Sequence, residues 1–344
     1  MNDHVNDHGK RRNRHVTIRD VAQRAGVSPQ TVSRAINNKG EISPETRQRI
    51  LAIAQEMGYR PNSIARGLKT NRTLTVGVVV PDIANPFFAE VVRGASEIAH
   101  SRHYGVLLCN TDERPEREWA ILHMLEAHRV DGLLLISSRL TDERLHQAIE
   151  TWQPIVLINR LQRPRPGVGY VLVNDAEAAF RAVRYLVSQG HRCIAFLGGS
   201  PKSRSGMERR QGYLKAMRTA GLTTEDSWCL PCSPDVEGGR QAALKLLSEH
   251  PEVTAILAYN DLVAFGVLQA CRTLGRQVPK DCALLGWDDI IFASYATPPL
   301  STMRMPKYQI GERAMALLLD LMTKPESTPP PILLDAELIL RESA

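Results

Sequence analysis

The sequence predicts an all-α helix-turn-helix head and a hinge helix, joined to a larger α/β core of two lobes with parallel, doubly wound sheets. Residues 17–37 encode two short helices around a glycine turn. Positive charge is concentrated in residues 1–72. After that point, apolar runs of strand length alternate with amphipathic helical stretches, as is typical of parallel sheets covered on both faces.

The first helix of the head is expected to begin after Thr17, which can form a capping box with Asp20. Gly26 stands where a helix end needs a left-handed residue. Ser28 and Pro29 suit the cap and the first position of the second helix. The outer face of that helix carries polar side chains, most of which can donate hydrogen bonds: Gln30, Thr31, Ser33 and Arg34. This face suits the DNA major groove, and an ordinary helical hairpin with a polar face is the alternative.

The charge distribution favours DNA over the plain hairpin. Residues 1–72 contain 14 Lys and Arg against 6 Asp and Glu, a net charge of +8. The remaining 272 residues contain 29 against 31, a net charge of −2. A basic head on a near-neutral body indicates a polyanionic partner. Residues 1–15 have almost no apolar content, and we interpret them as a disordered basic arm.

The head is expected to span 16–60, with a third helix that opens at Ser43 and ends at Gly58. The next segment, 61–72, can hold a helix of about two turns, which is too short to be stable alone in water. Gly67 weakens that helix by a further ~1 kcal/mol relative to Ala. We interpret the segment as a hinge that folds only on DNA, with Leu68 as an apolar wedge for a minor-groove step. A plain linker is the alternative.

The core, 73–344, is predicted to contain two lobes because the strand–helix cycle restarts near Asn174. Strands are expected at 74–80, 104–109, 132–136, 155–158, 193–198, 254–259 and 282–287. Helices are expected near 87–102, 115–128, 141–150, 175–189, 207–220, 238–249, 261–274 and 308–323. Lobe 1 would hold about 73–173 and 304–331, and lobe 2 about 174–303 and 332–344. A ligand cleft is expected where the carboxyl ends of the strands face each other.

Several classes of protein are disfavoured by what the sequence lacks. No run approaches 18 consecutive apolar residues and no secretory signal is found, so we expect a cytoplasmic protein without a membrane partner and with reduced cysteines. No phosphate loop, nucleophile elbow or zinc motif occurs, so we expect no enzyme, cofactor or metal site. Cys229 and Cys232 have thioredoxin-like spacing, but Ser-Pro-Asp follows and breaks the required helix. We interpret the spacing as chance, with a redox-responsive loop as the alternative.

Several motifs follow one another in a characteristic order: the helix-turn-helix, Tyr59-Arg-Pro-Asn-Ser-Ile-Ala-Arg-Gly-Leu68, Asn85-Pro-Phe-Phe-Ala-Glu90, Arg129-Val-Asp-Gly-Leu-Leu134, Gly190-His-Arg192, Asn260-Asp261 and Gly286-Trp-Asp-Asp289. In this order and spacing the chain resembles the lactose-repressor/galactose-repressor (LacI/GalR) family over about residues 16–343. The resemblance implies a homodimeric or tetrameric bacterial transcription regulator. Its core would resemble periplasmic sugar-binding proteins.

For DNA, the resemblance places the base-reading positions on Pro29, Gln30 and Arg34. Pro29 cannot donate a hydrogen bond, so reading would depend on Gln30 and Arg34, each worth ~1–3 kcal/mol of discrimination. The phosphate-contacting positions fall on Ser28, Thr31, Ser33, Asn37 and Tyr59, and we add Thr17 and Lys69 to the DNA-binding set. The positions that enter the minor groove fall on Asn62, Ala65 and Leu68.

For the effector, the resemblance implies a cleft lined by Phe87, Phe88, Asn159, Ser203, Ser205, Arg209, Asn260 and Asp288. Arg209 and Asp288 would act as charged clamps on the ligand. Core packing is the alternative for Phe88, and a surface helix arginine is the alternative for Arg209. The loop near 234 lacks the aromatic ring that many relatives use for stacking, and Trp287 or Phe87 could replace it. Arg204 and Arg210 hint at an acidic ligand.

Together these expectations describe a repressor whose affinity for a palindromic operator is set by a small-molecule effector, a sugar, a sugar acid or a related metabolite. A homodimer is favoured over a tetramer because the chain end near Ala344 leaves no room for an appended heptad segment. A sugar-binding protein of the periplasmic type without a regulatory role is the alternative. An α/β enzyme is a weaker one, since no catalytic motif is found.

Overall fold

The computed structural model describes residues 16–38, 40, 42–59, 72–200 and 202–344. The chain divides into two compact units, Met1–Thr73 and Leu74–Ala344. The predicted basic arm at 1–15 and nearly all of the predicted hinge at 61–72 lie outside the described residues. The same holds for four predicted DNA-binding residues: Asn62, Ala65, Leu68 and Lys69.

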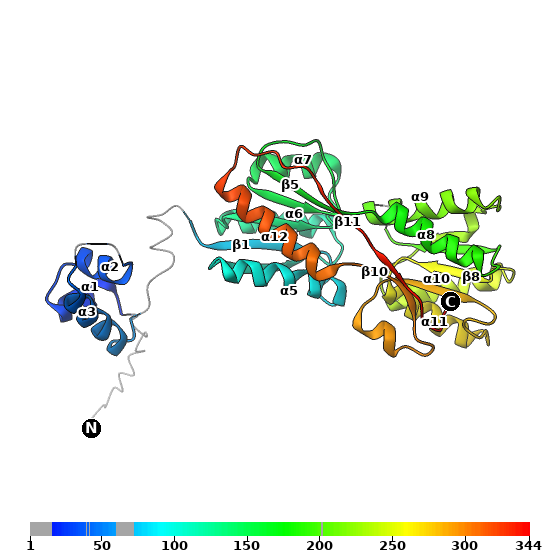
Figure 1. Cartoon of the computed structure of the whole chain (residues 1–344), viewed down its shortest axis with the longest axis horizontal. Helices are drawn as coiled ribbons and strands as arrows, with labels where there is room; N and C mark the ends of the chain where they lie inside the picture. The colour runs from blue at the N-terminus through cyan, green and yellow to red at the C-terminus, as the bar shows by residue number, and fades with distance from the viewer. Residues whose placement is uncertain (1–15, 39, 41, 60–71, 201) are drawn as a thin grey trace, which may run out of the picture. The chain divides into compact units, whose positions relative to one another are not determined.

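The head contains the predicted helices, labelled α1 (Ile18–Ala25), α2 (Pro29–Ile36) and α3 (Pro44–Glu56) in Figure 1. Both members of the capping box are present, because the Thr17 backbone N–H donates to Asp20 Oδ2 at 2.8 Å and the Asp20 N–H donates to Thr17 Oγ1 at 3.4 Å. Gly26 has the predicted left-handed conformation, with φ of 65°. Val21, Val32 and Ile50 are fully buried where the helices meet. The helix-turn-helix is therefore confirmed.

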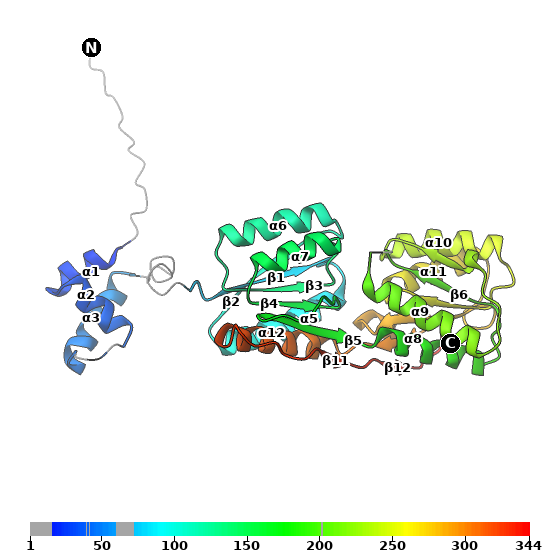
Figure 2. The same ribbon diagram turned by 90° about the horizontal axis from the view of Figure 1, so that it is seen from above.

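The first lobe of the core is built on a parallel sheet in the order β11-β5-β4-β3-β1-β2. Its strands are β1 (Thr75–Val80), β2 (Gly105–Asn110), β3 (Gly132–Ile136), β4 (Ile155–Ile158), β5 (Val168–Val173) and β11 (Ile332–Leu334). Helices α5 (Pro86–Ser101) and α12 (Lys307–Thr323) cover one face, and α6 (Pro115–Ala127) and α7 (Asp142–Thr151) cover the other (Figure 2). Strands β3, β4 and β5 are buried along their whole length, as a doubly covered sheet requires.

The second lobe repeats this arrangement in the order β12-β10-β9-β8-β6-β7, with only β12 antiparallel to its neighbour. Its strands are β6 (Ile194–Gly198), β7 (Cys229–Pro231), β8 (Ala255–Ala258), β9 (Ala283–Asp288), β10 (Ser301–Arg304) and β12 (Glu337–Ile339). Its helices are α8 (Asp175–Ser188) and α9 (Arg204–Thr219) on one face, with α10 (Val236–Glu249) and α11 (Asp261–Thr273) on the other. Short 3₁₀ turns lie at Asp226–Trp228 (η1) and Ile291–Tyr295 (η2).

In each lobe the second strand along the chain forms one edge of the sheet beside the first strand. The third strand pairs with the first strand on its other side. In each sheet the strand order reverses between the first and third strands, which are β1 and β3 in lobe 1 and β6 and β8 in lobe 2. Ligands of open α/β sheets bind outside the carboxyl ends of the strands at such a switch point. The predicted fold class of two doubly wound lobes is therefore confirmed, and the topology itself indicates where a ligand would bind.

The chain passes between the lobes after β5, after β10 and after β11. The crossing after β11 corrects one predicted boundary between the lobes. Ile332–Leu334 pairs with β5 in the first sheet, so assigning all of 332–344 to lobe 2 was wrong for these three residues. The shift follows from strand pairing, because only the residues after Leu334 reach β10 in the second sheet.

Five strands of the structure, β5, β7, β10, β11 and β12, were not predicted as strands from the sequence. In β5 the strand pattern is interrupted by Gly169, and glycine weakens a strand assignment. The structure explains the residue, because a Cβ at Gly169 would overlap the side chain of Leu317 on α12. Strands β7 and β10 have only three and four residues, and each gains its stability from the neighbouring strand of the sheet.

Close contact between α5 and α12 gives a test of the packing in lobe 1. A Cβ at Gly94 would overlap the carbonyl oxygen of Tyr308. Overpacking of this kind costs ~1–3 kcal/mol, and the cost is higher where backbone must move. We expect Gly94→Ala to lower the free energy of unfolding by at least ~2 kcal/mol in urea titrations. Gly105→Ala is the control, because its Cβ would meet nothing closer than 3.7 Å. Equal stability of the two variants would contradict this packing.

Candidate functional site

The outer face of α2 is the candidate DNA-binding surface of the head. Ser28, Pro29, Gln30, Arg34 and Asn37 are exposed, and Thr31 and Ser33 are half-buried. Gln30 and Arg34 make no hydrogen bond or ion pair with the residues of the head that the structure describes. Their donor groups are therefore available for base edges.

Other residues predicted to contact DNA are already used by the head. The Ser28 Oγ accepts from the Thr31 N–H at 3.1 Å as the cap of α2, and the Asn37 amide donates to the Ser33 carbonyl at 2.7 Å. Thr17 is held in its capping box, and burial raises the pKa of Tyr59. Two arginines outside the predicted set, Arg47 and Arg49, donate to the last carbonyls of α2 and α1. Their charge therefore stabilises helix ends.

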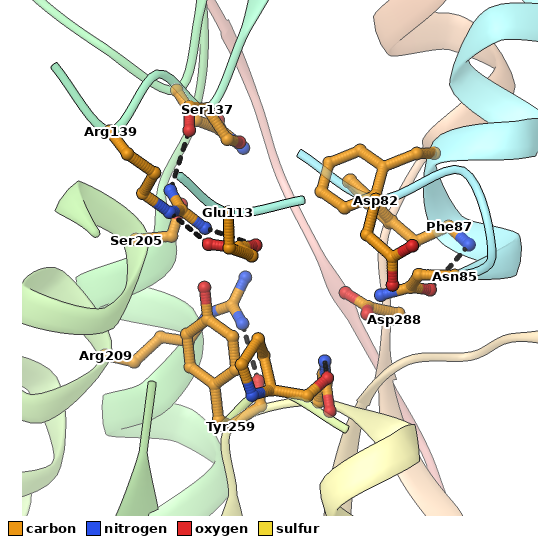
Figure 3. A pocket seen from close by; sticks show the side chains of 14 residues that line it. Asp82, Asn85, Phe87, Glu113, Ser137, Arg139, Ser205, Arg209, Tyr259 and Asp288 are labelled. Atoms are coloured by element: carbon orange, nitrogen blue, oxygen red, sulfur yellow. Dashed lines mark hydrogen bonds and ion pairs between the residues drawn. The ribbon is translucent and has the colours of Figure 1, made fainter. Parts of the chain in front are cut away.

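In the core, a pocket lies where the carboxyl ends of the strands of both lobes meet (Figure 3). It contains seven of the eight predicted effector-binding residues, Ser203 being the exception. Lobe 1 lines it with Asp82, Asn85, Phe87, Phe88, Glu113, Ser137, Arg139 and Asn159. Lobe 2 lines it with Ser205, Arg209, Pro234, Tyr259, Asn260 and Asp288. The role of each residue toward a ligand stays a prediction.

Arg209 forms the base of the pocket on the side of lobe 2, and its side chain is only 5% exposed. Its Nε donates to Asp175 Oδ1 at 2.9 Å, and Nη1 donates to the Tyr259 carbonyl at 2.6 Å. The guanidinium also lies over the Trp287 ring, 4.4 Å from its centroid. A surface arginine is thus excluded, and much of the charge of Arg209 is balanced within the protein.

Asp288, at the end of β9, is buried and faces the same pocket (Figure 3). Its carboxylate has no hydrogen-bond partner among the residues that the structure describes. Burial raises the pKa of Asp288 well above its ordinary value, and the nearby Arg209 opposes that rise. A ligand that donates hydrogen bonds would therefore meet an acceptor with unused capacity.

Asn260 and Ser203 cap helices of lobe 2. Asn260 Oδ1 accepts from the Val263 N–H at 2.8 Å, and its amide donates to the Pro234 carbonyl at 3.0 Å. Ser203 Oγ accepts from the Gly206 N–H and lies 3.0 Å from the Tyr259 hydroxyl. The predicted effector contact of Ser203 is not supported, because the residue caps α9 and does not line the pocket.

The apolar wall of the pocket comes from the first turn of α5. Phe87 and Phe88 form an edge-to-face pair with centroids 5.0 Å apart, and both line the pocket while packing into the core. Asn85 fixes the start of the helix by accepting from the Phe87 N–H at 2.9 Å. For Phe88 the two interpretations of its role are compatible, because one face of a ring can pack while another meets a ligand.

Lobe 1 contributes a second ion pair that the sequence did not reveal. Arg139 donates to both carboxylate oxygens of Glu113, at 2.5 and 3.0 Å, and to the Ser137 carbonyl at 2.7 Å. Behind it, the buried Glu118 accepts from the Arg139 N–H at 2.8 Å, and burial raises the pKa of Glu118. These contacts fix the arginine against the pocket wall.

Four of the lining residues adopt left-handed backbone conformations after strands or at their ends: Glu113 with φ of 59°, Ser137 with 48°, Asn159 with 54° and Asp288 with 107°. Such conformations are costly for residues other than glycine and are concentrated at functional sites. Here they turn the side chain toward the pocket after each strand. Sequence patterns carry no signal for them.

Seven lining residues were not predicted: Asp82, Asn85, Glu113, Ser137, Arg139, Pro234 and Tyr259. Asp82, Ser137 and Tyr259 could have been suggested by one common signal, since each lies at the carboxyl end of a predicted strand or just after it. Glu113, Arg139 and Pro234 lie deeper in loops, whose conformation the pattern of strands and helices does not define. Tyr259 supplies an aromatic ring near the gap left by the loop at 234.

Other predictions about the pocket need correction. Arg204 pairs with Glu208 at 2.6 Å, and Arg210 lies on the surface 3.8 Å from Asp226, so neither lines the pocket as an acidic ligand would require. Trp287 is fully buried beneath Arg209, with its indole N–H directed at Met305 Sδ at 3.1 Å, and cannot stack on a ligand.

Cys229 and Cys232 pack on opposite faces of the second sheet, which favours chance spacing over a redox-responsive loop. Cys229 packs on the α8–α9 side of the second sheet, and Cys232 packs on the α10–α11 side. Burial raises the pKa of the Cys232 thiol to about 12, which opposes formation of a reactive thiolate. The interpretation of chance spacing therefore holds, because a strand places residues three apart on opposite faces.

The pocket as a whole suits a neutral, polyhydroxylated ligand. Its three acidic residues, Asp82, Glu113 and Asp288, face two arginines, and both arginines are already paired with carboxylates. Amide, hydroxyl and carboxylate groups stand next to Phe87, Phe88 and Tyr259. Aromatic rings beside a few placed polar groups are typical of small-molecule sites. No group of three or more metal-ligating side chains occurs in the described part of the chain.

Comparisons with known proteins agree with this architecture. The model for bacterial regulatory proteins of the lacI family matches residues 17–62, and the periplasmic binding protein-like domain matches 183–344. Catabolite control protein A of Priestia megaterium is 35% identical over 310 residues, 90% of this chain and 93% of that protein. The transcriptional repressor CytR of Escherichia coli strain K12 is 35% identical over 327 residues, 95% and 96% of the two chains.

Two solved structures are also similar. The lac repressor dimer bound to operator and the anti-inducer ONPF has a TM-score of 0.86 at 28% identity, covering 96% of this chain and 99% of that one. The complex of the transcriptional regulator CelR with cellobiose has a TM-score of 0.73 at 32% identity, covering 96% and 100%. Both likenesses extend over the head and the two-lobed core.

Asp261, below the pocket, gives a prediction about pH. Its carboxylate is fully buried, accepts from the Thr302 hydroxyl and the Ile290 N–H, and has its pKa raised to about 7 by burial. Because the folded protein holds this proton more tightly than the unfolded chain, the free energy of unfolding falls as pH rises from about 4 to about 7. The decrease would be up to about 4 kcal/mol.

We expect Asp261→Asn to remove this part of the pH dependence, since an amide can accept from Ile290 and donate to Thr302 without ionising. Urea titrations of both proteins at pH 4.5, 6 and 8 measure it. Asp288 also has a raised pKa and faces the same region, so the comparison is the difference between the two slopes. Identical slopes would show that Asp261 stays ionised.

Proposed function

The chain belongs to the LacI family of bacterial regulatory proteins, and we propose from that premise that occupancy of its interlobe pocket sets the affinity of its head for operator DNA. It is a DNA-binding transcriptional regulator, and we propose that it acts as a repressor. The observation that supports effector control most directly is the pocket itself. Both lobes line it, so a bound ligand must favour particular arrangements of the two.

The proposed partner is a palindromic operator bound by a homodimer, as in the lac repressor dimer on its operator. A two-fold symmetric dimer presents two heads to two half-sites. An apolar patch on η2 supports a subunit contact in lobe 2. Ile291, Phe292 and Tyr295 are 66%, 56% and 79% exposed within five residues. Exposed apolar groups in such a cluster are typical of interfaces.

The proposed effector is a neutral sugar. The earlier hint of a sugar acid depended on Arg204 and Arg210, which do not line the pocket. Asp288 and Asp82 can accept from hydroxyl groups, and Phe87, Phe88 and Tyr259 can cover the apolar face of a sugar ring. A carboxylate on the ligand would face three acidic side chains and two arginines whose charge is already compensated. Cellobiose, the ligand of the similar CelR complex, is a neutral sugar of this kind.

Control of the head follows from energetics. A ligand can shift the equilibrium between two arrangements of the lobes only by its difference in affinity for them. The coupling works in both directions, so an operator that favours one arrangement must change the affinity of the pocket by the same factor. Whether the effector releases or promotes operator binding depends on which arrangement it prefers.

The protein is proposed to act in the cytoplasm, because it must share a compartment with its operator. Within the described residues, no helix combines the length and apolarity needed to cross a bilayer. The similar proteins named above are transcriptional regulators, which supports a regulator over an enzyme.

Base reading by the head can be tested at Arg34. Its guanidinium is exposed on α2, and a bidentate contact to guanine is worth ~1–3 kcal/mol. We expect Arg34→Ala to relax the preference at one base position in each half-site, when duplexes are selected from a randomised library and sequenced. Arg24→Ala, which changes an exposed arginine of α1, is the control and should keep the preference. An unchanged preference in Arg34→Ala would remove this residue from the reading set.

The effector class can be tested with three ligands of one carbon skeleton: glucose, gluconate and glucosamine, together with cellobiose. Saturating a site at 100 times its Kd stabilises the protein by about 2.7 kcal/mol, which a melting curve detects. We expect a neutral sugar to raise the melting temperature and to change the affinity for the selected duplex, and gluconate to do neither. Stabilisation by gluconate alone would contradict the assignment.

A further inference from the structure

We infer that Lys307 is the positioning residue that links the pocket floor of lobe 2 to the helix pair α5–α12 of lobe 1. The inference builds on the proposed function, because it names the contact through which pocket and operator influence each other. Lys307 does not line the pocket. It is the first residue of α12, directly after the chain has crossed from β10 in lobe 2 to lobe 1.

The ammonium group of Lys307 holds the loop that carries Asp288. Its Nζ donates to the Asp288 carbonyl at 2.6 Å and to the Asp289 carbonyl at 2.7 Å. The side chain is half-buried, and hydrogen bonds from a charged donor are about twice as strong as neutral ones. Asp288, whose carboxylate faces the pocket, is therefore bound through its own backbone to the start of a lobe 1 helix.

The loop that Lys307 holds is otherwise strained. Asp288 and Asp289 have φ of 107° and 53°, which are costly conformations for aspartate. Asp289 is fixed by ion pairs at 2.7 Å to both Arg304 and Arg341. Arg304 is the last residue of β10, and Arg341 follows β12. Next to it, the Ile290 N–H donates to Asp261 at 2.7 Å. These contacts bind the loop to other parts of lobe 2, whereas the hydrogen bonds from Lys307 bind it to lobe 1.

A second contact reaches the same crossing segment from Arg209. The Arg209 guanidinium lies over Trp287, and the indole N–H of Trp287 is directed at Met305 Sδ at 3.1 Å. Met305 stands two residues before Lys307. Asp288 thus contacts the segment 305–307 directly, and Arg209 is connected to it through Trp287.

Helix α12 connects Lys307 to the opposite wall of the pocket, because it packs directly against α5. Its glycine Gly311 lies against the Val91 carbonyl of α5, and Gly94 of α5 lies against the Tyr308 carbonyl, so the two backbones are in direct contact. Helix α5 begins with Asn85 as its cap and carries Phe87 and Phe88 in its first turn. If Asp288 shifts relative to lobe 1, its hydrogen bond to Lys307 therefore displaces the helix pair that supplies the apolar wall.

The experiment uses operator DNA as its probe, since coupling must act in both directions. The full-length protein is mixed with the duplex it selects from a randomised library, and amide hydrogen exchange is followed by mass spectrometry. In wild type we expect the duplex to change exchange by about fivefold, the lower end of typical couplings, in peptides covering 82–92 and 286–292. In Lys307→Met, which keeps the side-chain length without the donor, we expect no change in 286–292.

Two further variants make the test specific. Lys307→Arg keeps a charged donor and should retain the response, whereas a role in packing alone would not distinguish Arg from Met. Lys215→Met removes an exposed lysine of lobe 2, which lies over Phe180, and should respond as wild type. If Lys307→Met does not fold, Lys307→Gln replaces it, because its shorter amide cannot reach both carbonyls.

Failure of the inference is distinguishable from failure of the proposed function. A wild-type protein that selects no duplex contradicts the proposed function. A wild-type protein that binds its duplex without any change in the two core peptides overturns the inference. So does a Lys307→Met variant that binds the duplex and keeps the full response in 286–292. A response lost in Met and retained in Arg and in Lys215→Met supports it.

Discussion

The interactions of one buried guanidinium determine how the floor of the pocket is assembled. Arg209 of α9 reaches Asp175 at the start of α8, the Tyr259 carbonyl after β8 and the Trp287 ring in β9. These elements lie apart in the sequence and meet only in the folded lobe. Removing either partner of a buried ion pair leaves an uncompensated charge, which is costly. Placement of Asp175, Tyr259 and Trp287 therefore depends on Arg209, and the position of Asp288 beside it follows.

The pocket is shared by two lobes with the same strand order, and this symmetry has a mechanical consequence. Each lobe presents the carboxyl ends of its strands to the other, with helices covering both faces of each sheet. The chain crosses between them after β5, β10 and β11, and the second crossing is bound to the pocket floor through Lys307 and Met305. A ligand that contacts Asp288 and Arg209, as we propose, would act on this crossing without touching it.

The head is stabilised mainly by interactions between residues that are close in the sequence. Among the residues of the head that the structure describes, helices α1, α2 and α3 each begin at a capping side chain: Thr17, Ser28 and Ser43. Arg47 and Arg49 bind the carbonyls at the ends of two helices, so part of the positive charge has a structural role. What remains exposed on α2, above all Gln30 and Arg34, is available for recognition. Stability and binding thus use different basic residues of the same small domain.

Much of the fold was readable from the sequence, because caps, glycine turns and apolar periodicity are local properties. Thr17, Gly26 and Ser28 fixed the helices of the head, and the apolar runs fixed most strands of the core. Glycine in β5 and the shortness of β7 and β10 concealed those strands, since their stability comes from neighbours across the sheet. The pairing of Ile332–Leu334 with β5 is of the same kind.

Residues at the ends of predicted strands, such as Asn159 and Asp288, could be placed near the pocket from the sequence because parallel strands share one edge. The contacts of individual side chains could not. The sequence placed Arg204, Arg210 and Trp287 near a ligand, whereas Glu113, Arg139 and Tyr259 line the pocket instead. Which arginine faces the cavity, and which carboxylate neutralises it, depends on loop backbones and on distances between remote segments. Sequence alone therefore determined the family, the two units and the edge of the sheets that forms the site, and only the tertiary structure decided the charge and the contacts within it.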